Sequence, residues 1–272
     1  MFNVKQIKHI LLIILNIILV IVLLMLFLIV YNAYVNETTL KNHILSITEN
    51  KSDFSIKKIV FYSSANTIDT DQSSPWTFDS IYQYTDMAIY IENNSENGLY
   101  KNNTIKNLYI DNIQINPSPT YGNANLYFKP VASFAKNTLL TEPIKDKLDF
   151  SIILDGTIDY TNNAQLYASC ATPITLSYIN SNIKQDFSIL DTSSALTLDG
   201  SSLKRAGILL STIESTISFD ITIINNSNQT SKCNIIIDIP LETDTDSIYN
   251  GYLVYDKEVN FKFYEIEQKR HD

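Results

Sequence analysis

An unbroken apolar stretch dominates the hydrophobic pattern at the start of the chain. From Ile10 to Val30 the sequence reads ILLIILNIILVIVLLMLFLIV, with Asn16 as its one polar side chain. At about 1.5 Å per residue, such a helix spans about 30 Å, the thickness of a bilayer's hydrocarbon core. The pattern predicts a transmembrane helix over residues 10–31, through which the chain contacts the lipid bilayer.

A cleaved secretory signal is the competing interpretation, because Lys5 and Lys8 precede the stretch as a charged leader would. The apolar part of a signal peptide is about 7–15 residues long. Here no Lys, Arg, Asp or Glu stands between Lys8 and Glu37. The length therefore favours an uncleaved signal-anchor.

Charge asymmetry orients this anchor. Lys5 and Lys8 lie in the short N-terminal tail, residues 1–9, whereas the first acidic or basic residue beyond the stretch is Glu37. Positively charged flanks stay on the cytoplasmic side. We expect a single-pass protein of the cell membrane with a cytoplasmic N-terminus and an extracytoplasmic C-terminal part.

The periodicity changes after the anchor. Val35, Leu40, Ile44 and Ile47 recur at helical spacings, which predicts a helical stalk or connector over residues 32–51. From there to the C-terminus the apolar positions alternate with a period of two. This second pattern predicts one extracytoplasmic β domain over residues 52–272.

Two neighbouring runs show the period of two most clearly. Apolar residues occupy every second position in residues 215–224 and again in residues 233–240, and the polar sequence NNSNQTSK joins them. Such a pair predicts an antiparallel hairpin with one buried face.

Similar alternation predicts further strands along the domain. They lie at residues 54–62, 86–91, 105–115, 148–154, 174–179, 187–190, 195–198, 252–255 and 259–266. Many short strands without a helix of domain length predict a mainly β fold, an antiparallel β-sandwich that is jelly-roll-like or immunoglobulin-like. The glycines at positions 156, 200 and 251 follow Asp or Asn and fit turns that need a positive φ. Residues 201–211 fit either a helical turn or another strand.

Net charge separates the domain from nucleic-acid-binding proteins. The 18 basic and 29 acidic residues beyond position 35 give residues 36–272 a net charge of −11. A phosphate-binding surface needs clustered Lys and Arg. The sequence therefore predicts no nucleic-acid partner, and the acidity favours solubility.

The sequence is poor in patterns that support catalysis. Beyond residue 35 the histidines are His43, in the predicted connector, and His271, and neither position suits an imidazole held against a nucleophile. No zinc-ligand spacing, phosphate-binding loop or dinucleotide fingerprint occurs. We expect no cofactor, and the enzyme class that stays open is one that needs only carboxylates, as glycosidases do.

Two acidic segments offer oxygen ligands at alternate positions, as a calcium site would. The candidate ligands are Asp69 and Asp71 in the first segment and Asp244 and Asp246 in the second. Neither segment matches the EF-hand loop. Ordinary acidic turns are the simpler interpretation.

Cys170 and Cys233 are the only cysteines. An extracytoplasmic location permits a disulfide between them, which would stabilise the fold by about 4 kcal/mol in the chain-entropy model. The alternative is two buried thiols, and Cys233 falls on the apolar face of its predicted strand.

Tyrosines among Asn, Asp and Ser are the remaining candidates for binding, because the ring gives a flat apolar face and the neighbours give hydrogen bonds. Packing within the β core is the competing role. Those near predicted loops are Tyr82, Tyr84, Tyr100, Tyr121, Tyr160 and Tyr167.

Two functions from different classes follow. The first is a non-enzymatic binding or scaffolding module of the cell envelope, which recognises an envelope protein or a glycan. The second is a membrane-tethered hydrolase that acts on cell-wall glycans through carboxylates. In organisation alone, an anchor followed by an outside β domain, the chain resembles single-pass envelope proteins of Gram-positive bacteria.

Overall fold

The computed structural model describes residues 16, 18–31, 34, 52–71, 73, 75–94, 104–191, 193, 195, 197–241, 251–256 and 261–266, and for residues 69 and 70 it describes the backbone alone. The chain divides into two compact units, Met1–Lys51 and Ser52–Asp272.

The first unit contains an α-helix over residues 18–31, whose large apolar side chains are exposed. In the part of the chain that the structure describes, no helix is both long enough and apolar enough to cross a membrane. The predicted tail (residues 1–9), the start of the predicted anchor (10–15, with 17) and most of the predicted connector (32, 33 and 35–51) lie outside the described residues.

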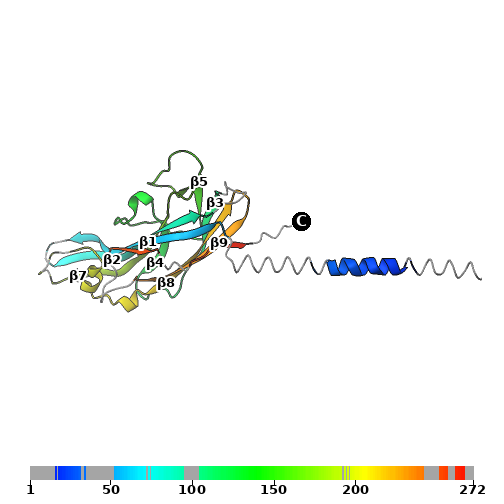
Figure 1. Ribbon diagram of the computed structural model, residues 1–272. Coiled ribbons are helices and arrows are strands. Elements are labelled where there is room, and N and C mark those ends of the chain that lie inside the picture. The colour runs from blue at the N-terminus through cyan, green and yellow to red at the C-terminus, as the bar shows by residue number, and fades with distance from the viewer. Residues whose placement is uncertain are drawn as a thin grey trace, which may run out of the picture. The chain divides into compact units, whose positions relative to one another are not determined.

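The second unit is mainly β, as the alternating pattern predicts. Its described strands form two sheets, with the orders β10-β1-β2-β7-β4 and β11-β9-β8-β3-β5-β6 (Figure 1). Neighbours are antiparallel except β5 and β6, which pair in parallel over three residues. The strands are β1 (Phe54–Asp71), β2 (Trp76–Asn93), β3 (Ile105–Ile115), β4 (Asn123–Phe128), β5 (Lys147–Ile153), β6 (Gln165–Tyr167), β7 (Ile174–Ile189), β8 (Ser215–Asn225), β9 (Thr230–Ile239), β10 (Gly251–Tyr255) and β11 (Tyr264–Ile266).

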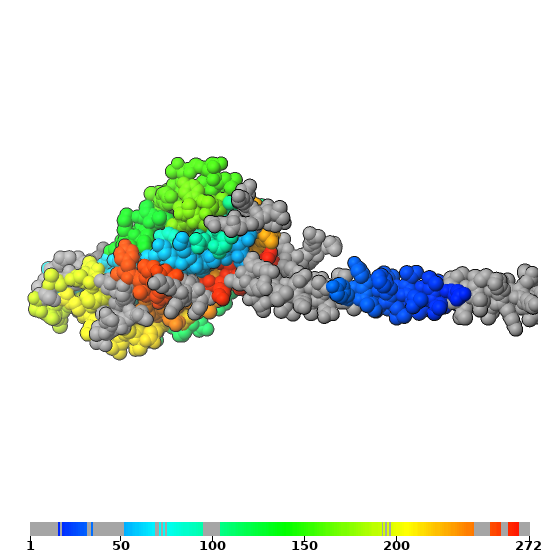
Figure 2. Space-filling view, in the orientation of Figure 1, coloured from blue at the N-terminus to red at the C-terminus, as the bar shows by residue number. Residues whose placement is uncertain are grey.

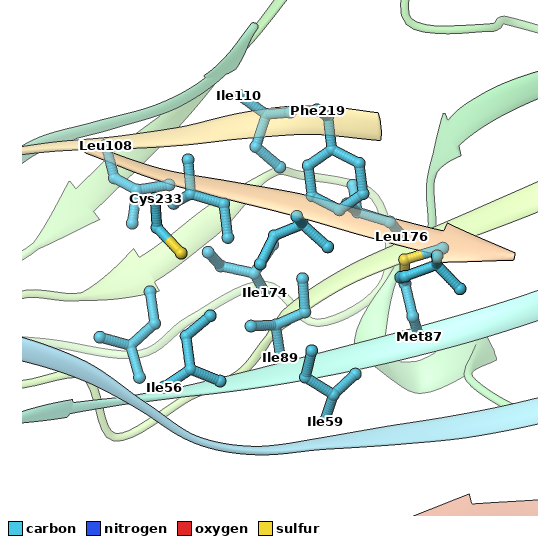
Figure 3. Packing of buried hydrophobic residues seen from close by; sticks show 14 of the residues in the cluster. Ile56, Ile59, Met87, Ile89, Leu108, Ile110, Ile174, Leu176, Phe219 and Cys233 are labelled. Atoms are coloured by element: carbon cyan, nitrogen blue, oxygen red, sulfur yellow. The ribbon is translucent and has the colours of Figure 1, made fainter. Parts of the chain in front are cut away.

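The main core lies between the two sheets. Figure 3 shows Ile59, Met87 and Leu176 from the first sheet, and it shows Ile110 and Phe219 from the second sheet on the opposite side of the same apolar layer. Successive side chains of a strand point to opposite faces, so residues of alternate positions build this layer from every long strand. Ile and Phe suit it because β-branched and aromatic side chains pack well on a pleated surface.

A second, smaller core lies where β1, β2 and β7 extend past the other sheet (Figure 1). Phe78 and Phe187 stack there with a centroid distance of 4.9 Å. The segment that contains helix α2 (Ser201–Arg205) and the 3-10 turn η2 (Leu210–Thr212) supplies Leu203 and Ile213 to cover them. The open choice for residues 201–211 is thus resolved as a short helix.

The connection between β4 and β5, residues 129–146, lies over the outer face of the first sheet, and we call it the cover segment. It includes the 3-10 turn η1 (Val131–Ser133), and Asn137 accepts a hydrogen bond from the Tyr82 hydroxyl. Figure 2 shows the green part of the chain that includes it above the cyan strands. As a result β2 is buried on both faces over much of its length.

Several predicted elements need correction. The hairpin is confirmed as β8 and β9, but the runs 174–179 and 187–190 are one strand, β7. Residues 195, 197 and 198 are not a strand but lie in a loop, where the Arg205 guanidinium donates to the Ala195 carbonyl at 3.1 Å. Gly200 has φ −53°, so a left-handed turn there was wrong, whereas Gly156 and Gly251 have the expected positive φ.

Candidate functional site

A cleft of about 360 Å³ lies at the open end of the β8–β9 hairpin, where β8 begins and β9 ends. Ser215 pairs with Ile239 and Thr216 with Asp238 in the antiparallel register. Because Ser215 and Ile239 face the core, alternation turns Thr216 and Asp238 to the outside, and Glu214, directly before β8, is exposed. The hairpin therefore places two carboxylates and a hydroxyl on one side of the cleft.

Apolar residues from separate segments complete the walls. They are Pro117 after β3, Leu210 in η2, and Pro240 and Leu241 after β9. The Asn116 amide donates to the Thr216 carbonyl at 2.9 Å, which keeps Pro117 beside the hairpin. The cleft walls therefore come from the β8–β9 hairpin and from the segments that follow β3, precede β8 and follow β9.

The cleft is acidic. The Thr216 hydroxyl donates to Oδ1 of Asp238 at 2.6 Å and orients that carboxylate. In the described part of the chain, no lysine, arginine or histidine forms an ion pair with Glu214 or Asp238. Such a site favours ligands that bring hydrogen-bond donors or positive charge, and it disfavours anions.

Behind the cleft, a hydroxyl pair connects it to the interior. The Ser215 hydroxyl lies 2.7 Å from the Tyr178 hydroxyl, and both residues are buried. Burial raises the pKa of Tyr178 to about 12, so the phenol stays neutral at physiological pH. Ser215 thus stands between the cleft and the main core.

A second groove, of about 460 Å³, borders the cover segment. Phe128, Leu140 and Pro143 line it together with Glu142 and Lys145. Lys147 also lines it but is engaged elsewhere, with its ammonium 2.6 Å from Asp149 and 4.0 Å from the Tyr109 ring centroid. This groove mixes both charges and therefore favours no single ligand chemistry.

The predicted calcium ligands do not assemble in the described residues. Asp71 is the last residue of β1, where Oδ1 accepts the Ser73 amide at 2.8 Å, and this backbone hydrogen bond lowers the Asp71 pKa. Asp69 lies in the same strand rather than in a loop. Asp244 and Asp246 lie outside the described residues, and within these no group of three or more His, Cys, Asp or Glu is arranged to hold a metal ion.

The two cysteines are free thiols in the structure. Cys233 is fully buried in the main core, and Cys170 is half-buried against it. Burial raises the pKa of both thiols to about 12. Of the two possibilities that the sequence leaves open, the structure therefore has two packed thiols and not the disulfide.

The tyrosines divide between core and surface. Tyr82 and Tyr84 are buried beneath the cover segment, so of the two roles open to them they take core packing. Tyr121 and Tyr160 are 52% and 39% exposed, and the Tyr167 hydroxyl donates to the Gly156 carbonyl. Tyr100 lies outside the described residues.

Sequence reasoning did not single out Glu214 and Asp238. Alternation does place Thr216 and Asp238 on polar faces of their strands, but it does not give the register between them. Without register, no spacing along the chain shows that these carboxylates share a cleft. No known protein family, curated protein or solved structure matches the chain.

Proposed function

We propose that this chain is a single-pass membrane protein whose β domain is a non-enzymatic binding module on the outer surface of the cell membrane. Support for the anchor is the apolar stretch from Ile10 to Val30, of which residues 18–30 are helical and apolar. Support for the orientation is the pair Lys5 and Lys8 on its short side.

The cleft at Glu214 and Asp238 is the observation that carries the binding role. Its carboxylates and the Thr216 hydroxyl accept and donate hydrogen bonds, and Pro117 and Pro240 provide flat apolar faces. This combination suits a neutral or amine-bearing glycan of the cell envelope, because sugars present hydroxyl groups around apolar C–H faces. An acidic polymer is repelled by the same carboxylates.

A second candidate function rests on the same two carboxylates. Both carboxylates line one cleft, because Glu214 directly precedes β8 and Asp238 lies in β9 opposite Thr216. Glycosidases act through a pair of carboxyl groups that flank the scissile bond. A membrane-tethered hydrolase of cell-wall glycans is therefore the alternative for this cleft.

The experiment compares retention of the full-length chain, purified in detergent, on insoluble cell-wall glycan. We expect the variant with Glu214→Gln and Asp238→Asn to lose at least tenfold in retention relative to wild type. Glu142→Gln, which removes a carboxylate from the second groove, is the matched control and should retain wild-type binding.

Three results distinguish the candidate functions. Equal retention of wild type and the double variant would overturn the cleft as the binding site. Release of reducing sugars by wild type, lost in the double variant, would establish the hydrolase instead. Retention on an envelope protein but not on glycan would replace the glycan with a protein partner.

A further inference from the structure

A lysine and an aspartate are buried together beneath the cover segment. Nζ of Lys129 lies 3.2 Å from Oδ2 of Asp86, and their side chains are 1% and 0% exposed. Asp86 is in β2, and Lys129 follows β4, so the pair reaches across β7, which lies between these strands. Burying two charges costs several kcal/mol per ion, and the attraction between them has to offset this cost.

Neighbouring residues hold both charged groups in place. Oδ1 of Asp86 accepts the Ser177 hydroxyl at 2.6 Å, and Oδ2 accepts the Ala135 amide at 2.9 Å. Nζ of Lys129 donates to the Lys136 carbonyl at 2.9 Å and lies 5.7 Å from the centroid of the Tyr84 ring. The amine thus lies next to one carboxyl group, in a buried site beneath the cover segment.

We propose that Lys129 and Asp86 form an intramolecular isopeptide bond, an amide between Nζ and Cγ. The bond from Nζ to Cγ forms and the bond from Cγ to Oδ2 breaks. Two of the three ammonium protons leave with Oδ2 as one water molecule, and the third stays on the amide nitrogen. An ammonium and a carboxylate contain every atom that the amide and water need, so no oxidant or co-reactant enters.

The site favours each stage of this condensation. Burial lowers the pKa of Lys129 and raises the pKa of Asp86, although each is partly offset by the other, so burial favours the neutral amine and acid that react. The Ser177 hydroxyl can stabilise the negative charge that develops on Oδ1 when the amine attacks. A closed, dry site also favours departure of water over hydrolysis of the product.

Formation of the amide removes both buried charges. An amide is neutral, and its carbonyl and N–H keep the hydrogen-bond partners that Ser177 and Lys136 already provide. The covalent bond would tie β2 to the end of β4 across β7. Its role is independent of the glycan-binding function proposed for the cleft.

The test is mass spectrometry of the full-length chain, purified in detergent, intact and after proteolysis. We expect wild type to be lighter than its sequence by the mass of one water molecule, with one branched peptide that joins the Lys129 and Asp86 segments. Lys129→Met should restore the full sequence mass. Wild-type peptides that carry Lys129 and Asp86 separately and unlinked would overturn the proposal, whether or not the variant folds.

The chain contains its own matched control. Lys147 and Asp149 approach more closely, at 2.6 Å, but their side chains are 44% and 68% exposed. Water has free access to this pair, and we expect it to stay unlinked. Loss of water mapped instead to Asp155-Gly156 or Asp199-Gly200, where a succinimide can form, would also overturn the assignment to Lys129.

Discussion

The hydroxyl groups of Tyr178 in β7 and Ser215 in β8 lie 2.7 Å apart and join the two sheets through one buried hydrogen bond. Tyr178→Phe removes one partner and leaves the Ser215 hydroxyl buried without it. We expect the free energy of unfolding to fall by about 1–2 kcal/mol. Urea titration followed by tyrosine and tryptophan fluorescence measures this loss.

Tyr160→Phe is the control for this change, because Tyr160 is 39% exposed and no hydrogen bond of its hydroxyl is seen in the described residues. Its unfolding midpoint should match wild type. An equal effect of both substitutions would show that the bond between the sheets contributes nothing.

Gln83 is fully buried, and neither atom of its side-chain amide has a hydrogen-bond partner among the described residues. Burying such a group costs about 1–3 kcal/mol. Gln83→Met keeps a similar shape and removes both polar atoms, so we expect the midpoint of thermal unfolding to rise. Asn180→Leu should lower it, because the Asn180 amide donates to the Tyr121 carbonyl at 2.9 Å. A lower midpoint for Gln83→Met would contradict this account.

Gly122 has φ +94°, and a Cβ at this position would lie 2.0 Å from Oδ1 of Asn180. We expect Gly122→Ala to destabilise the domain by more than the 1 kcal/mol or so that a positive φ costs alone. Gly156→Ala isolates the backbone effect, since Gly156 has φ +113° and no atom within 4 Å of the added Cβ. Similar losses for the two variants would refute a role for the contact with Asn180.

Asp220 lies on the outer face of β8, 4% exposed. Burial raises its pKa, but hydrogen bonds from Lys232, Asn234 and Asn112 outweigh burial and hold the pKa below the usual value. The folded-state pKa is therefore lower than the unfolded one. The stabilisation is complete above the unfolded pKa and is lost as the pH falls through the folded pKa.

We accordingly expect wild type to exceed Asp220→Asn in stability at pH 7 and to lose this advantage below about pH 3.9, the unperturbed value for aspartate. Urea midpoints of both proteins from pH 7 to pH 2 test it. A difference that stays constant over this range would rule out Asp220 as its source.

Cys170 and Cys233 should react slowly while the domain is folded. Burial raises both pKa values to about 12, and the thiolate is the reactive form. We expect iodoacetamide at pH 8 to label both only after unfolding. Rapid labelling of the native protein, or unfolded protein that takes up label only after reduction, would count against two buried thiols.

How far the sequence predicts the fold depends on how regular each strand is. The run 215–224 alternates cleanly, and the structure confirms it as β8. The predicted break between residues 179 and 187 is wrong because Asn180, Ser181 and Asn182 look like a turn, yet β7 continues through them with a positive φ at Asn182. The sequence did not predict β4, a strand of six residues, because Asn123 and Asn125 make this segment look like a loop.

The sites were harder to predict, because each depends on residues brought together by tertiary structure. Asp86 comes directly before the apolar run of residues 87–91, but nothing along the chain identifies Lys129 as its partner. Glu214 and Asp238 look like ordinary polar positions until register and the Pro117 loop are known. The local sequence pattern indicates which face of its strand a side chain occupies. The residues that it contacts there depend on packing between segments that are far apart in the sequence.

The inner face of β1, β2 and β7 changes character halfway along these strands. Ser63, Thr85, Gln83 and Asn180 form a polar belt, with the main core on one side and the core under α2 on the other. Apolar packing is what couples distant parts of a fold into one melting transition, and the belt interrupts it. The end covered by α2, whose neighbouring η2 residue Leu210 also lines the cleft, can therefore open as a separate cooperative unit while the main core stays folded.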